Sequence, residues 1–280
     1  MPSLPPINPE DEAAAAVKTN GGAFEPHAEH HDRPLVEYLQ RLGDDSLILG
    51  QRLGEWCGHA PSVEVDLSLA NIGLDLIGQA TFYLNLAGET EGADRDGDTL
   101  AFHRDVLDFR NCLLVEQPNG DFAQTIARQL LFSTWQHLLF EKLTGSANIR
   151  IAEIAAKAVK EVAYHAELAG EWVVRLGDGT DESRARMTGG LDWNWRFVPE
   201  LFYSDEVLTG LVQRGIAADV AELSGEWDRR IDAVLFEAKL ERPADQRPIL
   251  GGRNGHHSEH LGHLLATMQF LPRAYPGATW

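Results

Sequence analysis

The sequence predicts an all-α protein centred on a four-helix bundle with a long crossover connection and additional C-terminal helices. Apolar residues recur every three or four positions along most of the chain, which is the period of a helix with one buried face. No segment alternates apolar and polar residues convincingly, as a half-buried strand would. The 280 residues are 44% hydrophobic and 24% charged, which suits a globular protein with a full core. We therefore expect residues 34–280 to form one helical domain.

The N-terminal residues 1–33 differ from the rest of the chain in composition. They mix Pro, Ala, Gly and acidic residues without a sustained apolar period, which predicts a flexible tail. Three histidines lie close together in this tail: His27, His30 and His31. Because histidines on a flexible segment define no coordination geometry, we do not expect a functional metal site there.

Two helices are predicted to form a first hairpin. One spans roughly residues 34–57 and begins with Pro34, a residue favoured in the first turn of a helix. A break at residues 58–62 separates it from a second helix at roughly residues 63–88, which the EGADRDGD turn ends. The apolar positions that carry the helical period are Leu35, Leu39, Leu42, Leu49, Leu53, Trp56, Leu67, Ala70, Leu74, Ile77 and Leu84.

A connection with its own helix precedes a second hairpin. Residues 99–116 carry apolar residues at spacings of three and four, which predicts one shorter helix. After a QPNG turn, Asp121 is placed as the N-cap of a helix that extends to about residue 145. The next helix spans roughly residues 151–177. Two long hairpins joined by such a crossover are the arrangement of ferritin-like folds.

The C-terminal part of the chain adds further predicted helices outside the four-helix core. A loop composition at residues 243–257, rich in Pro and Gly, precedes the last of them. The predicted helical segments are residues 181–195, 204–214, 219–240 and 259–271.

The charge balance and the cysteine content exclude several classes of protein. The chain has 43 Asp and Glu residues against 24 Lys and Arg, a formal net charge of −19, which disfavours nucleic acid and anionic membrane surfaces as partners. The two cysteines form no CxxC pair, and neither a signal peptide nor a long apolar stretch is present. We therefore expect a cytoplasmic protein without a membrane span.

A carboxylate-bridged metal pair in such a bundle needs a Glu from each of two helices and a Glu-x-x-His from each of the other two. This sequence has the pattern only in outline. Both histidine positions hold residues that do not bind metal, and one carboxylate position holds a neutral amide, which weakens metal binding severely. We expect no metal in this chain, and each remaining carboxylate should either be protonated or have a neutralising Lys, Arg or His nearby. The degenerate ligand positions are Asp45, Asp75, Gly78, Gln129, Glu161 and Tyr164.

Histidines near these positions have a structural and a metal-binding interpretation. His165 could form a buried pair with Glu161 four residues earlier, and His59 could form a similar pair with Glu55 that caps the first helix. In both cases we favour the structural interpretation. Four histidines near the start of the last helix favour packing and capping by Ser258 or a neighbour, with a metal cluster as the alternative: His256, His257, His260 and His263.

Aromatic residues are concentrated between the helices at residues 181–195 and 204–214. Core packing at one end of the bundle and an interface anchor are equally compatible with this pattern. The residues are Trp193, Trp195, Phe197, Phe202 and Tyr203. The chain has no Gly-rich phosphate loop, GxSxG motif or calcium loop, which leaves phosphoryl transfer, serine hydrolysis and EF-hand binding without supporting residues.

Five strings of the sequence closely resemble the C subunits of the bacterial ring 1,2-phenylacetyl-CoA epoxidases, also called phenylacetate-CoA oxygenases. The resemblance runs from about residue 35 to residue 280 and excludes only the N-terminal tail. The strings are DDSLILGQRLGEWCGHAP, ANIGLDLIGQA, FRNCLLVEQPNGDFAQTIARQ, AAKAVKEVAYHAELAGEWVVRLGDGTDES and HLLATMQFLPRAYPGATW.

The resemblance implies a ferritin-like structural subunit that pairs with a catalytic A subunit. In that family the A subunit holds the di-iron centre and the CoA thioester site, and a reductase with FAD and a [2Fe-2S] cluster supplies electrons from NADPH. The complex inserts one oxygen atom of O₂ into the ring of phenylacetyl-CoA. For this chain the resemblance implies no catalytic residue and no cofactor, with the A subunit, the other epoxidase subunits and the reductase as partners.

Two other functions remain open at this point. The chain could be a metal-binding di-iron oxygenase subunit in its own right, using Asp45, Asp75, Gln129, Glu161 and His165, which predicts about two metals per chain. It could instead be an independent binding or storage protein of ferritin-like shape, which would form no stable complex with an A subunit.

Overall fold

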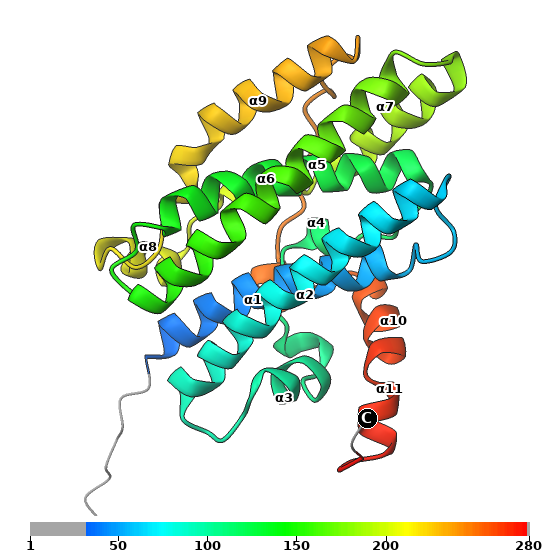
Figure 1. The fold of residues 1–280 in the computed structure, drawn as a ribbon. Helices are drawn as coiled ribbons and strands as arrows, with labels where there is room; N and C mark the ends of the chain where they lie inside the picture. Colours follow the sequence, from blue (N-terminus) through cyan, green and yellow to red (C-terminus); the bar gives the residue numbers. More distant parts are fainter. Residues whose placement is uncertain (1–31, 279–280) are drawn as a thin grey trace, which may run out of the picture. The chain divides into compact units, whose positions relative to one another are not determined.

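The computed structural model describes residues 32–278, and every regular element within that range is a helix. This confirms the all-α prediction. Two hairpins form the central bundle, with a crossover between them and further helices after them (Figure 1). The bundle helices are α1 (Arg33–Gly54), α2 (Val63–Glu91), α5 (Phe122–Leu143) and α6 (Ile149–Gly177).

Local capping interactions fix the starts of the bundle helices. The side chains of Ser62 and Asp121 accept hydrogen bonds from backbone N–H groups three residues later, at 3.4 and 2.9 Å. These bonds satisfy donors that the helix itself leaves without partners. At the other end of α2, Gly92 has a φ of 69°, a left-handed conformation that glycine adopts without steric cost and that stops the helix. Asp121 is the N-cap that the sequence predicted.

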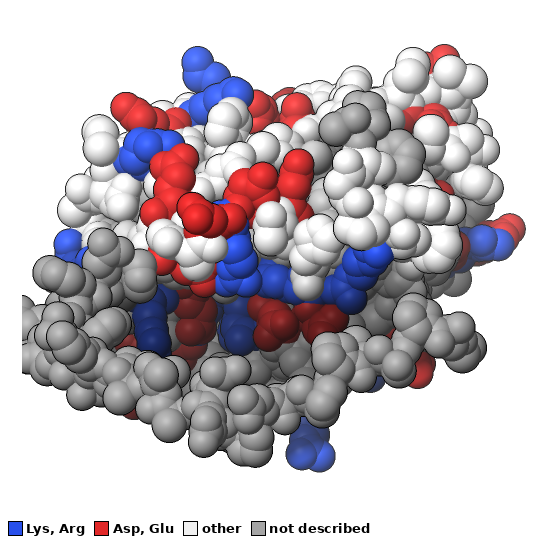
Figure 2. Space-filling model, turned by 90° about the horizontal axis from the view of Figure 1, so that it is seen from below, with Lys and Arg blue, Asp and Glu red and all other residues white. Residues whose placement is uncertain are grey.

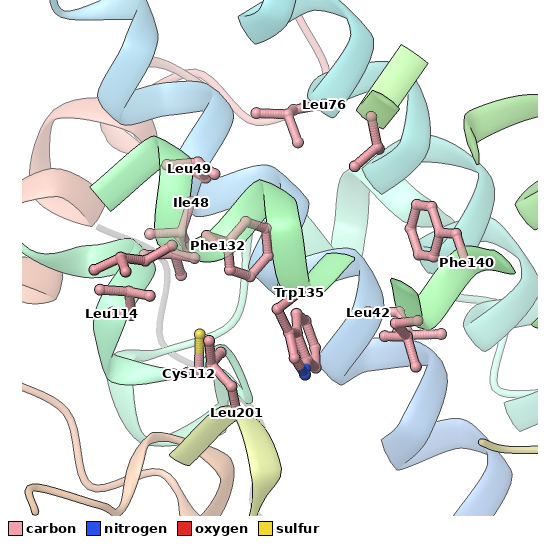
Figure 3. Packing of buried hydrophobic residues seen from close by; sticks show 14 of the residues in the cluster. Leu42, Ile48, Leu49, Leu76, Cys112, Leu114, Phe132, Trp135, Phe140 and Leu201 are labelled. Carbon is pink, nitrogen blue, oxygen red and sulfur yellow. The ribbon is translucent and has the colours of Figure 1, made fainter. Parts of the chain in front are cut away.

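The core lies where the two hairpins face each other. Within each hairpin, α1 packs along α2 and α5 packs along α6, and α2 also contacts α6. Figure 3 shows part of this core, with side chains from α1, α2, the crossover, α5 and the 3₁₀ turn at residues 198–202 in one cluster. Because the cluster combines residues from segments far apart in the sequence, it holds the crossover against the bundle. Its labelled members are Leu42, Ile48, Leu49, Leu76, Cys112, Leu114, Phe132, Trp135, Phe140 and Leu201.

The crossover differs from the single helix predicted at residues 99–116. It contains the short helix α3 (Gly97–Phe102), the 3₁₀ turn η2 (Val106–Asp108) and the four-residue helix α4 (Leu113–Glu116). Buried carboxylates explain the interruption, because they accept backbone N–H groups that a continuous helix would use internally. The acceptors are Asp44 for the N–H of Arg110 at 2.8 Å, Asp45 for that of Cys112 at 2.7 Å, and Glu200 for that of Leu113 at 2.6 Å.

The C-terminal helices follow the predicted order, but two of the predicted segments are each divided into two shorter helices. Of the two cysteines, Cys57 is exposed and Cys112 is buried, and neither is in a disulfide. Residues 243–257 have little regular structure, as predicted, apart from the 3₁₀ turn η5 (Gly252–Asn254). The predicted segment 219–240 divides into η4 and α9, the segment 259–271 divides at Gln269, and η3 was not predicted. The elements are α7 (Asp181–Trp195), η3 (Val198–Phe202), α8 (Glu206–Gln213), η4 (Val220–Leu223), α9 (Ser224–Glu237), α10 (Glu259–Met268) and α11 (Phe270–Ala274).

The predicted N-terminal tail and its three histidines, His27, His30 and His31, lie outside the described residues. The first helix begins at Arg33, one residue before the predicted start of the helical domain. Among residues 32–278, none of the helices combines the length and the apolar character needed to cross a membrane.

Candidate functional site

The six degenerate ligand positions do not converge on one point of the bundle. Asp75, Gly78 and Glu161 line one groove between α2 and α6. Tyr164 is 45% exposed and belongs to the outer surface of α6. Gln129 is buried within α5, and its amide nitrogen donates to the Ser133 hydroxyl at 2.9 Å.

Asp45 is the sixth position, and its carboxylate contacts the crossover and the C-terminal loop. It accepts the backbone N–H of Cys112 at 2.7 Å and lies 2.7 Å from a guanidinium nitrogen of Arg253. Asp45 is therefore paired by elements that lie outside the four bundle helices.

The groove between α2 and α6 has a volume of about 210 Å³. On its α2 side, Asp75 Oδ2 lies 3.0 Å from Nε2 of the fully buried His165. On its α6 side, Glu161 Oε2 accepts a hydrogen bond from the Gln79 amide at 3.1 Å. The predicted pair between Glu161 and His165 is therefore wrong, because each of these side chains bonds to a residue of α2.

A chain of neutral polar groups continues from Glu161 into the bundle. The Gln79 amide oxygen accepts from Gln136 of α5 at 3.3 Å, and the same Gln136 nitrogen reaches the Ser46 hydroxyl of α1 at 3.3 Å. Ser46, Gln79 and Gln136 are all buried. Each of the four bundle helices thus contributes one member to a hydrogen-bonded layer, and only one of the four members carries a charge.

The donor chemistry of this layer does not fit a carboxylate-bridged metal pair. Such a pair needs several charged oxygen donors and two imidazoles around a shared point, whereas Ser46, Gln79 and Gln136 offer a hydroxyl and two amides. The single histidine, His165, is bonded to Asp75. Within residues 32–278, no group of three or more His, Cys, Asp or Glu side chains is arranged to hold a metal ion. We therefore derive no chemistry through iron in this chain.

A basic side chain lies beside two of the three remaining carboxylates, whereas the prediction covered all three. Arg253 pairs with Asp45, His165 pairs with Asp75, and Glu161 has only the Gln79 amide. Burial favours the neutral form of Asp45 and raises its pKa, and the Arg253 charge opposes that effect. Burial alone would lower the pKa of Arg253, but the adjacent Asp45 carboxylate outweighs it and holds the pKa above its usual range.

A second buried ion pair, His257 with Glu116, ties the C-terminal loop to the crossover. His257 Nδ1 lies 2.7 Å from Glu116 Oε2, and the other ring nitrogen lies 3.0 Å from the Phe109 carbonyl oxygen. Burial lowers the pKa of His257, but the bond to Glu116 and its charge outweigh burial, so the pKa of His257 is raised.

The C-terminal histidines have separate environments. His257 points into the protein toward Glu116, His256 and His263 are exposed, and His260 is half-buried. Ser258 is the N-cap residue of α10, but its hydroxyl makes no capping bond; its backbone N–H donates to Glu116 instead, at 2.6 Å. The packing role predicted for this segment holds at His257, and the predicted side-chain cap at Ser258 is wrong.

The predicted capping pair of Glu55 and His59 does not form. Helix α1 ends at Gly54, so the two residues are not on a common helix face. His59 Nδ1 lies 3.1 Å from the Cys57 carbonyl oxygen, and Glu55 pairs with Arg52 at 2.9 Å.

The aromatic residues after α7 divide between the core and the surface. Trp195 and Phe202 pack against Trp227 of α9, with ring centroids 5.9 and 5.5 Å apart. Phe197 is also buried, whereas Trp193 and Tyr203 are exposed. Core packing therefore accounts for most of this segment.

A second cleft, of about 460 Å³, lies where the start of α1, the end of α2 and the crossover meet. Four arginines line it, but so do three acidic residues, and Arg95 and Arg104 are already paired with Glu91 and with the buried Asp44. Figure 2 shows the molecule from below, with basic and acidic side chains interleaved where the surface is visible. Because three acidic residues offset most of the positive charge, this cleft is a weak candidate for binding an anion.

Sequence reasoning missed Gln79 and Gln136, and a signal for both was available. Each is a polar residue on the apolar face of its helix, Gln79 between the buried Leu76 and Tyr83, and Gln136 four residues after the buried Phe132. Arg253, Glu116 and Glu200 had no such signal, because they lie in loops or short turns.

Comparison with known proteins confirms the resemblance carried by the five strings. Residues 22–280 match the family model described as phenylacetic acid catabolic protein. Over 246 residues the chain is 50% identical to the C subunit of the 1,2-phenylacetyl-CoA epoxidase of Escherichia coli strain K12. The alignment covers 88% of this chain and 99% of that protein. The chain therefore belongs to the phenylacetic acid catabolic protein family.

Proposed function

We propose that this chain is a non-catalytic structural subunit of a phenylacetyl-CoA 1,2-epoxidase that pairs with and supports the catalytic A subunit. Its high similarity to the C subunit of such an epoxidase, over nearly the whole length of that protein, supports the assignment to the complex. The complex would use O₂ to convert phenylacetyl-CoA to its 1,2-epoxide, a step in aerobic phenylacetate degradation. The chain would act in the cytoplasm, where NADPH and CoA thioesters are available.

The polar layer of the bundle supports a non-catalytic role. Between the four bundle helices, this chain has Ser46, Gln79 and Gln136 hydrogen-bonded in a chain that ends at Glu161. Amides and a hydroxyl maintain the helix packing that charged ligands and metal would otherwise maintain, without supplying a redox centre. We propose that the di-iron centre belongs to the A subunit, and that FAD, [2Fe-2S] and NADPH act in the reductase.

Replacing Gln129 tests this assignment, because the oxygenase alternative uses that residue as a ligand. Gln129 is buried and its amide oxygen has no hydrogen-bond partner, so Gln129→Leu removes a buried polar group that is only half satisfied. If Gln129 is not a ligand, we expect turnover per assembled complex within about twofold of wild type. If Gln129 were a ligand of a reacting metal, turnover would fall sharply, because such ligands rarely tolerate this change. Size-exclusion chromatography with the A subunit verifies assembly, and epoxide formation with the A subunit and reductase gives the rate. A fall of orders of magnitude with normal assembly would contradict the structural role.

A further inference from the structure

One face of α2 lacks charge to a degree unusual for this protein. From Leu67 to Gly88 the helix contains a single charged residue, Asp75, although 24% of the whole chain is charged and the net charge is −19. Three large apolar side chains on this face reach solvent: Leu67 is 60% exposed, Leu74 70% and Phe82 44%. Their spacings of seven and eight residues place them along one stripe of the helix. Depletion of charge around exposed large apolar side chains is the composition of an interface core.

The groove between α2 and α6 runs beside this stripe and extends it. The two helices lie side by side (Figure 1). Leu74 and Phe82 form part of the groove wall on α2, and Ile154 lies on the α6 side. A neighbouring hollow of about 360 Å³ shares Phe82 and Ile154 with the groove. The apolar stripe and both hollows together form one continuous surface, which we name the α2–α6 face.

Gly78 makes the centre of the α2–α6 face an open socket. A Cβ atom placed on Gly78 would meet no side chain or other segment within 4 Å, apart from its immediate neighbours in the helix. In the middle of a helix, glycine costs stability relative to alanine, and the described structure has no backbone strain or close contact at Gly78 that requires it. An incoming side chain that fills the space over Gly78 would explain why a residue without a side chain is present there.

The charges in the groove indicate the kind of partner. Asp75, Glu161 and Lys157 line it, for a formal charge of −1, and the Lys157 ammonium lies over the Phe82 ring, 4.4 Å from its centroid. A symmetric dimer would bury this surface against its own copy and bring two net negative charges together in a desolvated site. A different chain with a basic side chain at this point would neutralise the charge instead.

We propose that the α2–α6 face docks the catalytic A subunit, which inserts apolar side chains along Leu67, Leu74 and Phe82 and a basic side chain over Gly78 toward Glu161. This inference rests on the proposed function. The contact would need about 800 Å² from each partner to be stable. The stripe on α2 supplies its apolar centre, and charged residues that line the two hollows supply a polar rim: Glu89, Arg150, Glu153, Lys157 and Glu161.

Two pairs of matched variants test the face. Leu74→Asp puts a charge at its centre and Gly78→Trp fills the socket. Leu74 is 70% exposed and a Cβ on Gly78 would meet no side chain or other segment within 4 Å, so little packing inside this chain is lost. The controls change exposed sites on other helices: Phe236→Asp on α9, where Phe236 is 87% exposed, and Gly189→Trp on α7, where a Cβ also meets nothing within 4 Å. Circular dichroism and Tm show that each variant is folded.

Affinity for the purified A subunit, measured by biolayer interferometry, is the readout. We expect Leu74→Asp and Gly78→Trp to weaken binding at least about tenfold, as substitutions in an interface centre do, and both controls to bind like wild type. Glu161→Gln should weaken binding several-fold and reduce its dependence on salt. If wild type binds no A subunit, the proposed function fails. If wild type binds and Leu74→Asp and Gly78→Trp bind equally well, this face is not the docking site.

Two further outcomes overturn parts of the proposal. If Glu161→Gln binds the A subunit as tightly as wild type, the part of the proposal that places a basic side chain of the partner near Glu161 is wrong. A dimer of the isolated chain in light scattering, converted to monomer by Leu74→Asp, would make a second copy of this chain the occupant.

Discussion

Nε2 of His165 on α6 lies 3.0 Å from Oδ2 of Asp75 on α2 and connects the two hairpins of the bundle. Imidazole and carboxylate are the two ligand types of a carboxylate-bridged metal centre, and here they bind each other. The Asp75 side chain is 38% exposed at the edge of the groove, so it also contacts solvent. The contact therefore links the hairpins and gives Nε2 of His165 a carboxylate partner, whereas the buried Nδ1 of the same ring has no hydrogen-bond partner.

Arg253 is expected to be a principal stabilising residue of the C-terminal loop. Arg253→Ala leaves the buried Asp45 carboxylate without its cation, which should lower the free energy of unfolding by about 3–5 kcal/mol. Urea denaturation of the isolated chain measures this quantity. The control is Arg186→Ala, which removes exposed ion pairs with Glu182 and Asp121 and should cost less than about 1 kcal/mol. Equal decreases in the unfolding free energy of the two variants would show that the buried pair with Asp45 stabilises the fold no more than an exposed ion pair does.

The pair of His257 and Glu116 should make stability depend on pH above neutrality. The folded pKa of His257 is raised above the unfolded value of about 6.5. Its stabilising contribution is therefore fully present below that unfolded value and is lost as pH rises through the folded pKa. We expect the gap in unfolding free energy between wild type and His257→Gln to be largest near pH 6 and to narrow toward pH 9.

Urea titrations of both proteins across that pH range provide the measurement. His263→Gln serves as control, because His263 is exposed and should give a small gap that does not change with pH. A gap for His257→Gln that stays constant from pH 6 to 9 would rule out the ion pair as its source.

Two glycines of the first hairpin should respond oppositely to alanine. Gly78→Ala adds a methyl group in open space and should raise the free energy of unfolding by about 0.5–1 kcal/mol, since alanine is the better helix former. Gly43→Ala should lower it, because the new Cβ would lie 2.7 Å from Cδ2 of the buried Leu84. Thermal and urea denaturation measure both changes. A loss of stability in Gly78→Ala would mean that the socket is not open.

The bundle helices could be predicted from the sequence because the residues that define their ends lie within a few positions of them. Ser62 and Asp121 cap helices a few residues away, and α7 begins and ends at the predicted residues 181 and 195. The crossover could not be predicted in the same way. Asp44 and Asp45 accept its backbone N–H groups from more than 60 residues away, and nothing in the local pattern of residues 99–116 indicates these partners.

The candidate site was predictable in its residue types but not in its geometry. The spacing of Asp75 with Gly78, and of Glu161 with Tyr164, predicts a shared inward face, yet Gly78 opens to solvent and Tyr164 is exposed. The residues that follow them in sequence, Gln79 and His165, are the buried ones. Likewise, Arg253 is 208 residues from Asp45, so only the folded chain identifies it as the partner.

Metal content tests the central claim most directly, namely that this chain keeps the bundle and leaves the iron to its partner. Plasma mass spectrometry would be run on the chain purified from iron-supplemented cells, alone and bound to the A subunit. The account predicts near-zero iron for the isolated chain and about two irons per heterodimer, the number in a di-iron centre. About two irons in the isolated chain would contradict it and make this chain a candidate oxygenase.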